Sequence, residues 1–187
     1  MSYKLWLKTY LRHPLQLGAL FPSSSALGSL MVSHISPNSN GHILELGSGT
    51  GSFTRALIRI GIPQENLVLV EKSPAFTILL KDLFPKAKVI CGDAKDATKL
   101  LDALGIEEVD QIISAIPLNA IGSKLSHIIC NGGFEILKSG GSFVQVSYIP
   151  RCSIPKTVIA AHSAEKIYCG MTVRNFPPGF VWRAEKP

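Results

Sequence analysis

Short apolar runs alternate with helical patterns over most of the chain, from His42 to Tyr148. Five of these runs are rich in Val, Ile and Leu and nearly continuous, as is typical of central strands covered on both faces of a sheet. They read HILELG, LVLVE, AKVICGD, VDQIISAI and GSFVQVSY. Apolar residues recur at helical spacing between them, and the pair Gly132-Gly133 is a candidate break in the last helix. This alternation predicts an α/β fold with a doubly wound parallel sheet.

The C-terminal segment departs from the alternation. Two apolar stretches, KIYCGMTVRN and FVWRA, are separated only by the turn sequence FPPG. A parallel neighbour needs a crossover of about a dozen residues, so the last strand should run antiparallel to its predecessor. No repeat or linker divides the chain, and we expect one domain over residues 1–187, with a helical cap over 1–40 and a core over 41–187.

Composition and charge narrow the class of protein. Hydrophobic residues make up 46% of the chain and charged residues 17%, which argues against disorder. No apolar run reaches the ~18 residues that span a bilayer, and no signal peptide is evident. The four cysteines show no metal-ligand spacing, so we expect reduced thiols and no metal site. The net charge is +6, and both ends of the chain are basic, which suits either nucleic acid or an anionic membrane surface.

A glycine-rich turn follows the first predicted strand, in HILELGSGTGSFT. A phosphate-binding P-loop needs Lys and Ser or Thr after the last glycine, but Ser52 and Phe53 follow Gly51 here. A dinucleotide fingerprint needs its third glycine where Ser52 stands, although serine is small and this exclusion is softer. The turn therefore predicts a nucleotide-like ligand of another kind.

Three acidic residues stand at the carboxyl ends of three successive predicted strands, where open α/β sheets bind ligands. Glu45, just ahead of the glycine turn, suits a ligand with a positive amino group better than a pyrophosphate. Glu71 can accept hydrogen bonds from both hydroxyls of a ribose, and Asp93 from an adenine amino group. The alternative for Glu71 and Asp93 is that each only caps the following helix.

This combination of the E-x-G-x-G-x-G turn, the two later acids and the terminal hairpin resembles the class I S-adenosylmethionine-dependent methyltransferases. The resemblance implies a Rossmann-like sheet of seven strands and S-adenosylmethionine as cofactor. The segments LRHPLQLGALFPSSSAL, VEKSPAF, GDAKD, SAIPL and SFVQVSY are more closely similar to the small bacterial phospholipid N-methyltransferases. These enzymes methylate the amine of phosphatidylethanolamine and are related to the ribosomal RNA adenine dimethylases.

The resemblance implies a set of site residues. Those expected to bind the cofactor are Glu45, Gly47, Ser48, Gly49, Gly51, Glu71, Lys72, Asp93 and Ala94. Pro117 and Leu118 would shape the acceptor channel, while Tyr148 and Tyr10 would orient the amine or contact phosphate, unless they are ordinary core or surface tyrosines. The turn and helix predicted around Ser23–Ser25 would cover the cofactor.

The sequence of the loop after the fourth predicted strand helps to distinguish a nucleobase from other candidate methyl acceptors. DNA and RNA amino-methyltransferases often carry a polar residue and a stacking aromatic there, whereas this chain reads Ala115-Ile116-Pro117-Leu118. That argues against a nucleobase as the acceptor. No base that would take the proton of a lipid amine is evident in the sequence.

The N-terminal segment carries a basic amphipathic pattern in which Lys4, Lys8 and Arg12 share one helical face. Such a helix, with Trp and Tyr among its apolar residues, suits a membrane interface; docking of its apolar side on the domain is an equally good interpretation. The leading hypothesis is a cytoplasmic phospholipid N-methyltransferase, peripherally associated with the inner membrane face. The alternatives are an RNA or DNA amino-methyltransferase and a non-catalytic S-adenosylmethionine-binding module.

Overall fold

A computed structural model describes residues 23–35 and 41–187 of the chain, which fold around one seven-stranded sheet. The strands are β1 (Ile43–Leu46), β2 (Leu67–Glu71), β3 (Lys88–Cys91), β4 (Val109–Ser114), β5 (Leu137–Ser147), β6 (Glu165–Thr172) and β7 (Gly179–Glu185). Their order across the sheet is β3-β2-β1-β4-β5-β7-β6. β1 to β5 pair in parallel, whereas β7 is antiparallel to both β5 and β6. The doubly wound, mostly parallel sheet with an antiparallel terminal hairpin is therefore confirmed.

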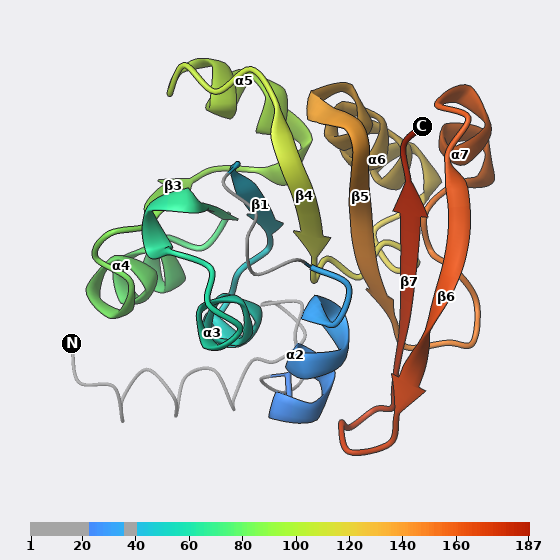
Figure 1. The fold of residues 1–187 in the computed structure, drawn as a ribbon, viewed down its shortest axis with the longest axis horizontal. Helices are drawn as coiled ribbons and strands as arrows, with labels where there is room; N and C mark the ends of the chain where they lie inside the picture. Colours follow the sequence, from blue (N-terminus) through green and yellow to red (C-terminus); the bar gives the residue numbers. More distant parts are fainter. Residues whose placement is uncertain (1–22, 36–40) are drawn as a thin grey trace.

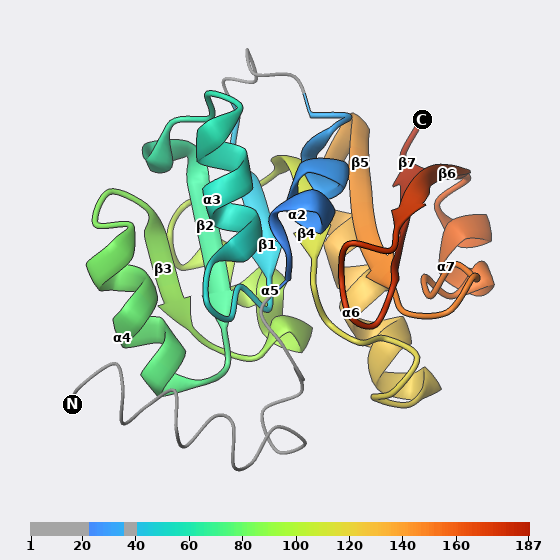
Figure 2. The ribbon, with the colours of Figure 1, turned by 90° about the horizontal axis from the view of Figure 1, so that it is seen from below.

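The α-helices lie on both faces of this sheet (Figures 1 and 2). They are α2 (Ser25–Val32), α3 (Ser52–Arg59), α4 (Pro74–Leu83), α5 (Ala97–Asp102), α6 (Ser123–Ile136) and α7 (Lys156–Ala161), with 3₁₀ turns η2 (Gln64–Asn66) and η3 (Ala94–Asp96). One core contains residues of α2, α3 and α4, and the other contains residues of α5, α6 and α7. The domain thus has a helix layer on each side of the sheet.

The apolar strands divide their side chains between these two cores. In β2, Leu67 and Leu69 belong to the core with α2 and α3, whereas Val68 and Val70 belong to the core with α5 and α6. Successive side chains of a strand point to opposite faces, so a strand covered on both sides needs apolar residues at every position. This is the physical reason for the nearly continuous runs.

Two features of the C-terminal half differ from the simplest interpretation of the sequence. The pair Gly132-Gly133 does not interrupt α6. A Cβ at Gly133 would lie 2.7 Å from the Phe143 ring, so the glycine allows the helix to pack closely on β5. The short helix α7 was also not foreseen, because KTVIAA is too brief to show a helical period.

The predicted cap around Ser23–Ser25 is confirmed. The Ser24 side chain accepts a hydrogen bond from the Leu27 amide at 3.2 Å and so caps α2. α2 packs on α3 and against β5, β6 and β7, and it lies below the arrowhead of β4 in the view of Figure 1. The predicted amphipathic helix with Lys4, Lys8 and Arg12 lies outside the described residues.

Candidate functional site

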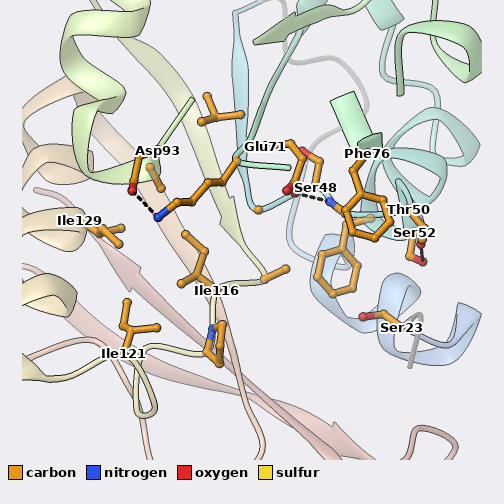
Figure 3. Close-up of a pocket in the computed structure, with 18 of the residues that line it drawn as sticks. Ser23, Ser48, Thr50, Ser52, Glu71, Phe76, Asp93, Ile116, Ile121 and Ile129 are labelled. Atoms are coloured by element: carbon orange, nitrogen blue, oxygen red, sulfur yellow. Dashed lines mark hydrogen bonds and ion pairs between the residues drawn. The ribbon is translucent and has the colours of Figure 1, made fainter. Parts of the chain in front are cut away.

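A cavity of about 420 Å³ opens at the carboxyl ends of the parallel strands. Its wall comes from the loops after β1, β2, β3, β4 and β5, from α4 and α6, from Ser23 ahead of α2 and from the turn between β6 and β7. Figure 3 shows Asp93, Ile116, Ile121 and Ile129 on one side of this cavity, with Ser23, Ser48, Thr50 and Ser52 on the other. Open α/β sheets bind their ligands at this edge, so the cavity is the candidate site.

The glycine-rich turn connects β1 to α3 and forms one wall of the cavity. Gly47, Gly49 and Gly51 all have positive φ angles, of 75°, 52° and 76°. A Cβ at Gly47 would lie 3.0 Å from the Ile116 side chain, so a larger residue there would be strained and would crowd the loop after β4. Of the predicted loop residues, Gly47, Ser48 and Gly49 line the cavity, while Gly51 sits behind them as the N-cap of α3.

Glu71 ends β2 and fixes the glycine turn. One carboxylate oxygen accepts a hydrogen bond from the Gly49 amide at 2.8 Å (Figure 3). The other oxygen accepts from the Ser73 amide at 2.7 Å. A carboxylate offers about four lone-pair positions, so two remain for a ligand. The side chain lines the cavity and has acceptor capacity for two hydroxyl groups, while its role beside a ribose stays a prediction.

Asp93 and Lys72 form an ion pair at 2.9 Å on the cavity wall (Figure 3). Partial burial raises the pKa of Asp93, but hydrogen bonds from Lys72 and from the Lys95 amide outweigh this effect and hold the pKa below its usual value. The carboxylate is therefore charged at neutral pH and able to accept from an amino group. Ala94 lines the cavity next to it, as predicted.

Glu45 occupies a different place from the other acids. It is 1% exposed and is absent from the cavity wall, because its carboxyl group lies against Thr54 of α3. One oxygen accepts a hydrogen bond from the Thr54 hydroxyl at 2.6 Å, and the other, Oε1, is buried without a partner among the described residues. Burial raises the pKa of Glu45 to about 8, which the Thr54 bond partly counteracts. Glu45 therefore does not reach the cavity, and the expectation that it contacts a ligand directly is wrong for this structure.

The loop after β4 forms an apolar part of the wall. Ala115, Ile116 and Pro117 line the cavity, and the role of Pro117 in shaping an acceptor channel stays a prediction. Leu118 is 3% exposed and packs into the core beneath α6, so it does not line the acceptor channel as expected. The chain turns directly after Pro117, where the Ala120 amide donates to the Pro117 carbonyl at 2.8 Å, and Leu118 packs on the core side of this turn.

Buried hydrogen bonds hold this loop in place. The Gln145 side chain of β5 donates to the Ile116 carbonyl at 2.9 Å, and the Ser126 hydroxyl of α6 donates to the Leu118 carbonyl at 2.6 Å. The Ile116 amide donates to the Ser114 hydroxyl at 3.3 Å. Gln145 and Ser126 stand on separate elements, so the loop is pinned to β5 and to α6.

Tyr148 follows β5 directly and lines the cavity, with 38% of its surface exposed. Burial of the hydroxyl raises the pKa of Tyr148, and a hydrogen bond with Ser23 counteracts this in part. The hydroxyl is therefore a neutral donor and acceptor near pH 7. Tyr10, the second predicted tyrosine, lies outside the described residues.

Several cavity residues were missed from the sequence. The apolar residues Ile121, Leu125 and Ile129 come from α6 and the loop before it, and Phe76 comes from α4. Their signal in the sequence is weak, because apolar residues of a helix look alike whether they face a cavity or the core. Asn175, Phe176 and Pro177 come from the turn between β6 and β7, whose sequence FPPG indicated only a turn.

The wall fits S-adenosylmethionine. Glu71 offers acceptors for ribose hydroxyls, and Asp93 with the neighbouring isoleucines offers an acceptor beside an apolar surface for a flat base. Gly49 lines the cavity, and a Cβ there would meet no atom nearer than the Gly47 carbonyl oxygen at 4.0 Å, so a ligand chain can lie close to the backbone at this glycine. Among residues 23–35 and 41–187, no three His, Cys, Asp or Glu side chains are grouped to hold a metal ion. No helix in these same ranges is long and apolar enough to cross a membrane.

Comparisons with known sequences give two matches. A family model described as the TrkA-N domain matches residues 48–130, from the glycine turn to the middle of α6, which is less than half of the chain. The ornithine lipid N-methyltransferase of Singulisphaera acidiphila is 28% identical over 152 residues, which cover 80% of this chain and 79% of that protein.

Solved structures share the fold. The 16S rRNA methyltransferase RsmC of T. thermophilus, in complex with AdoMet and guanosine, matches with a TM-score of 0.66 and 21% identity, over 89% of this chain and 44% of its own. An O-methyltransferase from Bacillus cereus, in complex with SAH, matches with a TM-score of 0.66 and 15% identity, over 100% of this chain and 92% of its own. The chain thus spans less than half the length of RsmC. The expected class I methyltransferase fold is confirmed.

Proposed function

We propose that this S-adenosylmethionine-dependent methyltransferase, a relative of lipid N-methyltransferases, transfers methyl groups to the primary amine of a membrane lipid. Phosphatidylethanolamine is the acceptor predicted from the sequence. The curated relative is named for ornithine lipid, whose head group also carries an amine. The single observation that carries the proposal is the apolar loop Ala115-Ile116-Pro117 on the cavity wall.

This loop is poorly suited to a nucleobase. No side chain of Ala115, Ile116 or Pro117 can hydrogen-bond a base amine. The Ile116 carbonyl already accepts from Gln145 and from the Leu118 amide, and the Pro117 carbonyl accepts from the Ala120 amide. A lipid carries its amine on a flexible, otherwise apolar molecule and needs fewer hydrogen-bond partners from this loop than a base does. This favours a lipid over RNA as the acceptor.

Methyl transfer mainly requires that the acceptor amine is aligned with the methyl group of the cofactor. S-adenosylmethionine supplies an electrophilic methyl group on a sulfonium, so the protein needs chiefly to bring an amine lone pair in line with it. A lipid amine is largely protonated at neutral pH and must lose a proton before attack. Tyr148 is the polar side chain best placed to orient the amine, because its hydroxyl lies on the wall beside Ser23. Proton release then proceeds to water at the cavity mouth.

We further propose that the enzyme acts peripherally at the cytoplasmic face of the membrane. The support is the basic amphipathic pattern of residues 1–13, together with the net charge of +6. Deleting residues 1–13 should weaken binding to vesicles that contain phosphatidylglycerol. Unchanged binding would remove this segment from the proposal but would leave the lipid acceptor untouched.

The acceptor is tested with vesicles of defined head group and labelled S-adenosylmethionine. Label should enter phosphatidylethanolamine or ornithine lipid, and the ratio of the two initial rates would identify the preferred head group. Phosphatidylcholine, which has no free amine, is the control and should remain unlabelled. Equal labelling of phosphatidylcholine, or labelling of neither amino lipid, would contradict the proposal.

A further inference from the structure

The turn between β6 and β7 carries exposed apolar side chains at the mouth of the cavity. Phe176 is 78% exposed and Val173 72% exposed, and Met171 at the end of β6 is 47% exposed. Tyr148 and Ile149, which follow β5, are also exposed. We name these five residues the hairpin rim. They lie at one end of the sheet, because Phe176 and Tyr148 line the same cavity and Phe180 of β7 pairs both with Ser147 of β5 and with Met171 of β6.

The turn is held firmly in this position. Asn175 is buried, and its side-chain oxygen accepts a hydrogen bond from the Ser24 amide at 2.9 Å. Its amide nitrogen donates to the Pro177 carbonyl at 2.8 Å. The turn is thereby fastened to the start of α2, and Figure 1 shows it reaching beyond the ends of the other strands. Apolar side chains are thus presented outward on an ordered support.

Within the two chain segments that form the hairpin rim, residues 148–151 and 171–176, the charged residues are both arginines. Arg174 lies between Val173 and Asn175, and Arg151 follows Ile149 by two residues; both arginines are exposed. The nearest acids along the hairpin, Glu165 and Glu185, pair with each other at the opposite end of β6 and β7. No acidic residue stands between Glu135 and Glu165 or between Glu165 and Glu185. Arginines flanking exposed apolar groups are complementary to anionic head groups above acyl chains.

We propose that the hairpin rim is a membrane contact that inserts its apolar side chains into an anionic phospholipid surface and so sets the cavity mouth on the bilayer. This inference rests on the proposed lipid acceptor and deepens it, since it assigns a route by which the lipid amine enters. It is independent of the N-terminal segment, because every residue that carries it lies in the part of the chain that the structure describes. The contact uses Arg174 and Arg151 for lipid phosphates and Val173, Met171 and Phe176 for the acyl boundary.

The test compares Val173→Ser with Ile78→Ser in the full chain. Ile78 is 64% exposed on α4, away from the rim, and so provides a matched control for the loss of an exposed apolar side chain. Binding is measured by co-flotation with vesicles of phosphatidylcholine mixed with phosphatidylglycerol. We expect Val173→Ser to weaken binding about tenfold, on the scale of a buried aliphatic side chain, and Ile78→Ser to leave it unchanged.

Arg174→Ser adds a second arm. It should weaken binding about fivefold on vesicles with phosphatidylglycerol and leave binding to pure phosphatidylcholine vesicles unchanged. Unchanged vesicle binding in both Val173→Ser and Arg174→Ser would overturn the inference, as would an equal loss in Ile78→Ser. A change in oligomeric state with Val173→Ser, measured by light scattering without vesicles, would instead assign the rim to a contact between copies and would also overturn it.

The experiment separates this inference from the proposed function. Methyl transfer to a short-chain phosphatidylethanolamine below its micelle concentration needs no membrane contact. If Val173→Ser retains this transfer but loses vesicle binding, the inference is supported. If wild type methylates the soluble lipid while none of the rim variants affects vesicle binding, the function stands and the rim fails. If wild type methylates no amino lipid in either form, the proposed function itself fails.

Discussion

The carboxylate of Glu71 accepts a hydrogen bond from the amide of Gly49 at 2.8 Å, across 22 positions of sequence. This bond joins the end of β2 to the glycine turn that follows β1. Because the second carboxylate oxygen is held by the Ser73 amide, the side chain cannot turn away from the cavity. One residue thus holds the glycine turn and presents its remaining acceptor positions to the cavity.

Replacement of Glu71 should weaken cofactor binding through both effects. We expect Glu71→Ala to lower the affinity for S-adenosylhomocysteine about 10- to 100-fold, since a hydrogen bond to a charged group contributes about 1.5–3 kcal/mol. The measurement is isothermal titration calorimetry. Glu65→Ala is the control, because Glu65 is an exposed acid that pairs with Lys86 away from the cavity. Unchanged affinity in Glu71→Ala would contradict the assignment of this residue.

The pH dependence of stability should carry a signature of Glu45. Because burial raises its folded pKa to about 8 from 4.5, the folded state retains a proton that the unfolded state releases. The contribution of Glu45 to stability is therefore complete below pH 4.5 and is lost as the pH rises through about 8, at about 1.4 kcal/mol per pH unit.

Glu45→Gln removes this titration, so its stability relative to wild type should rise between pH 5 and pH 8. Urea unfolding of the two proteins without cofactor, at matched pH values, measures the difference. Glu107→Gln, at an exposed position, provides the control for a general loss of one acid. A difference between wild type and Glu45→Gln that does not change with pH would show that Glu45 is already charged in the folded protein.

Replacement of Gln145 should weaken binding of the methyl acceptor and change the stability of the fold little. Its side chain holds the Ile116 carbonyl, and its own Oε1 is buried without a partner among the residues described. Gln145→Leu loses the anchor of the loop but also removes this unpaired oxygen, so the melting temperature should change little. The KM for the lipid acceptor should rise several-fold, while the affinity for S-adenosylhomocysteine stays within about twofold. A parallel loss of both affinities would indicate a general disturbance of the sheet instead.

Asn175 should contribute to stability through the turn that it fastens. Asn175→Ala leaves the Ser24 amide without its acceptor and the Pro177 carbonyl without its donor. Removal of a buried hydrogen-bonding side chain costs about 1–3 kcal/mol, and thermal or urea unfolding measures it. Arg174→Ala, at the exposed neighbouring position, should cost less than about 0.5 kcal/mol. Equal effects of the two variants would mean that the turn is not fastened by Asn175.

Much of the fold follows from local patterns in the sequence. The strands were predicted because runs such as LVLVE serve two cores at once, and the hairpin because four residues leave no room for a crossover. The position of β7 between β5 and β6 could not be predicted in this way. It depends on long-range pairing, such as that of Val144 with Arg183, which leaves no local trace.

Residues of the candidate site could be predicted where the site requires one particular type of residue. Glycines with positive φ and acids at strand ends are rare enough to be noticed, and Gly47, Gly49, Glu71 and Asp93 all belong to the cavity wall or to its support. The orientation of Glu45 and Leu118 was not predictable, because a single residue at a strand end or loop faces the cavity or the core according to its tertiary neighbours.

The most direct test of the central claim is where the methyl group goes. Wild-type protein is given labelled S-adenosylmethionine together with phosphatidylethanolamine vesicles and ribosomal RNA in the same reaction, and the two fractions are then separated and counted. The account predicts label in the lipid fraction and none above background in RNA, with the lipid label lost in Glu71→Ala. Label in the RNA alone would contradict it, and would mean that the apolar loop at Ala115-Ile116-Pro117 accepts a nucleobase after all.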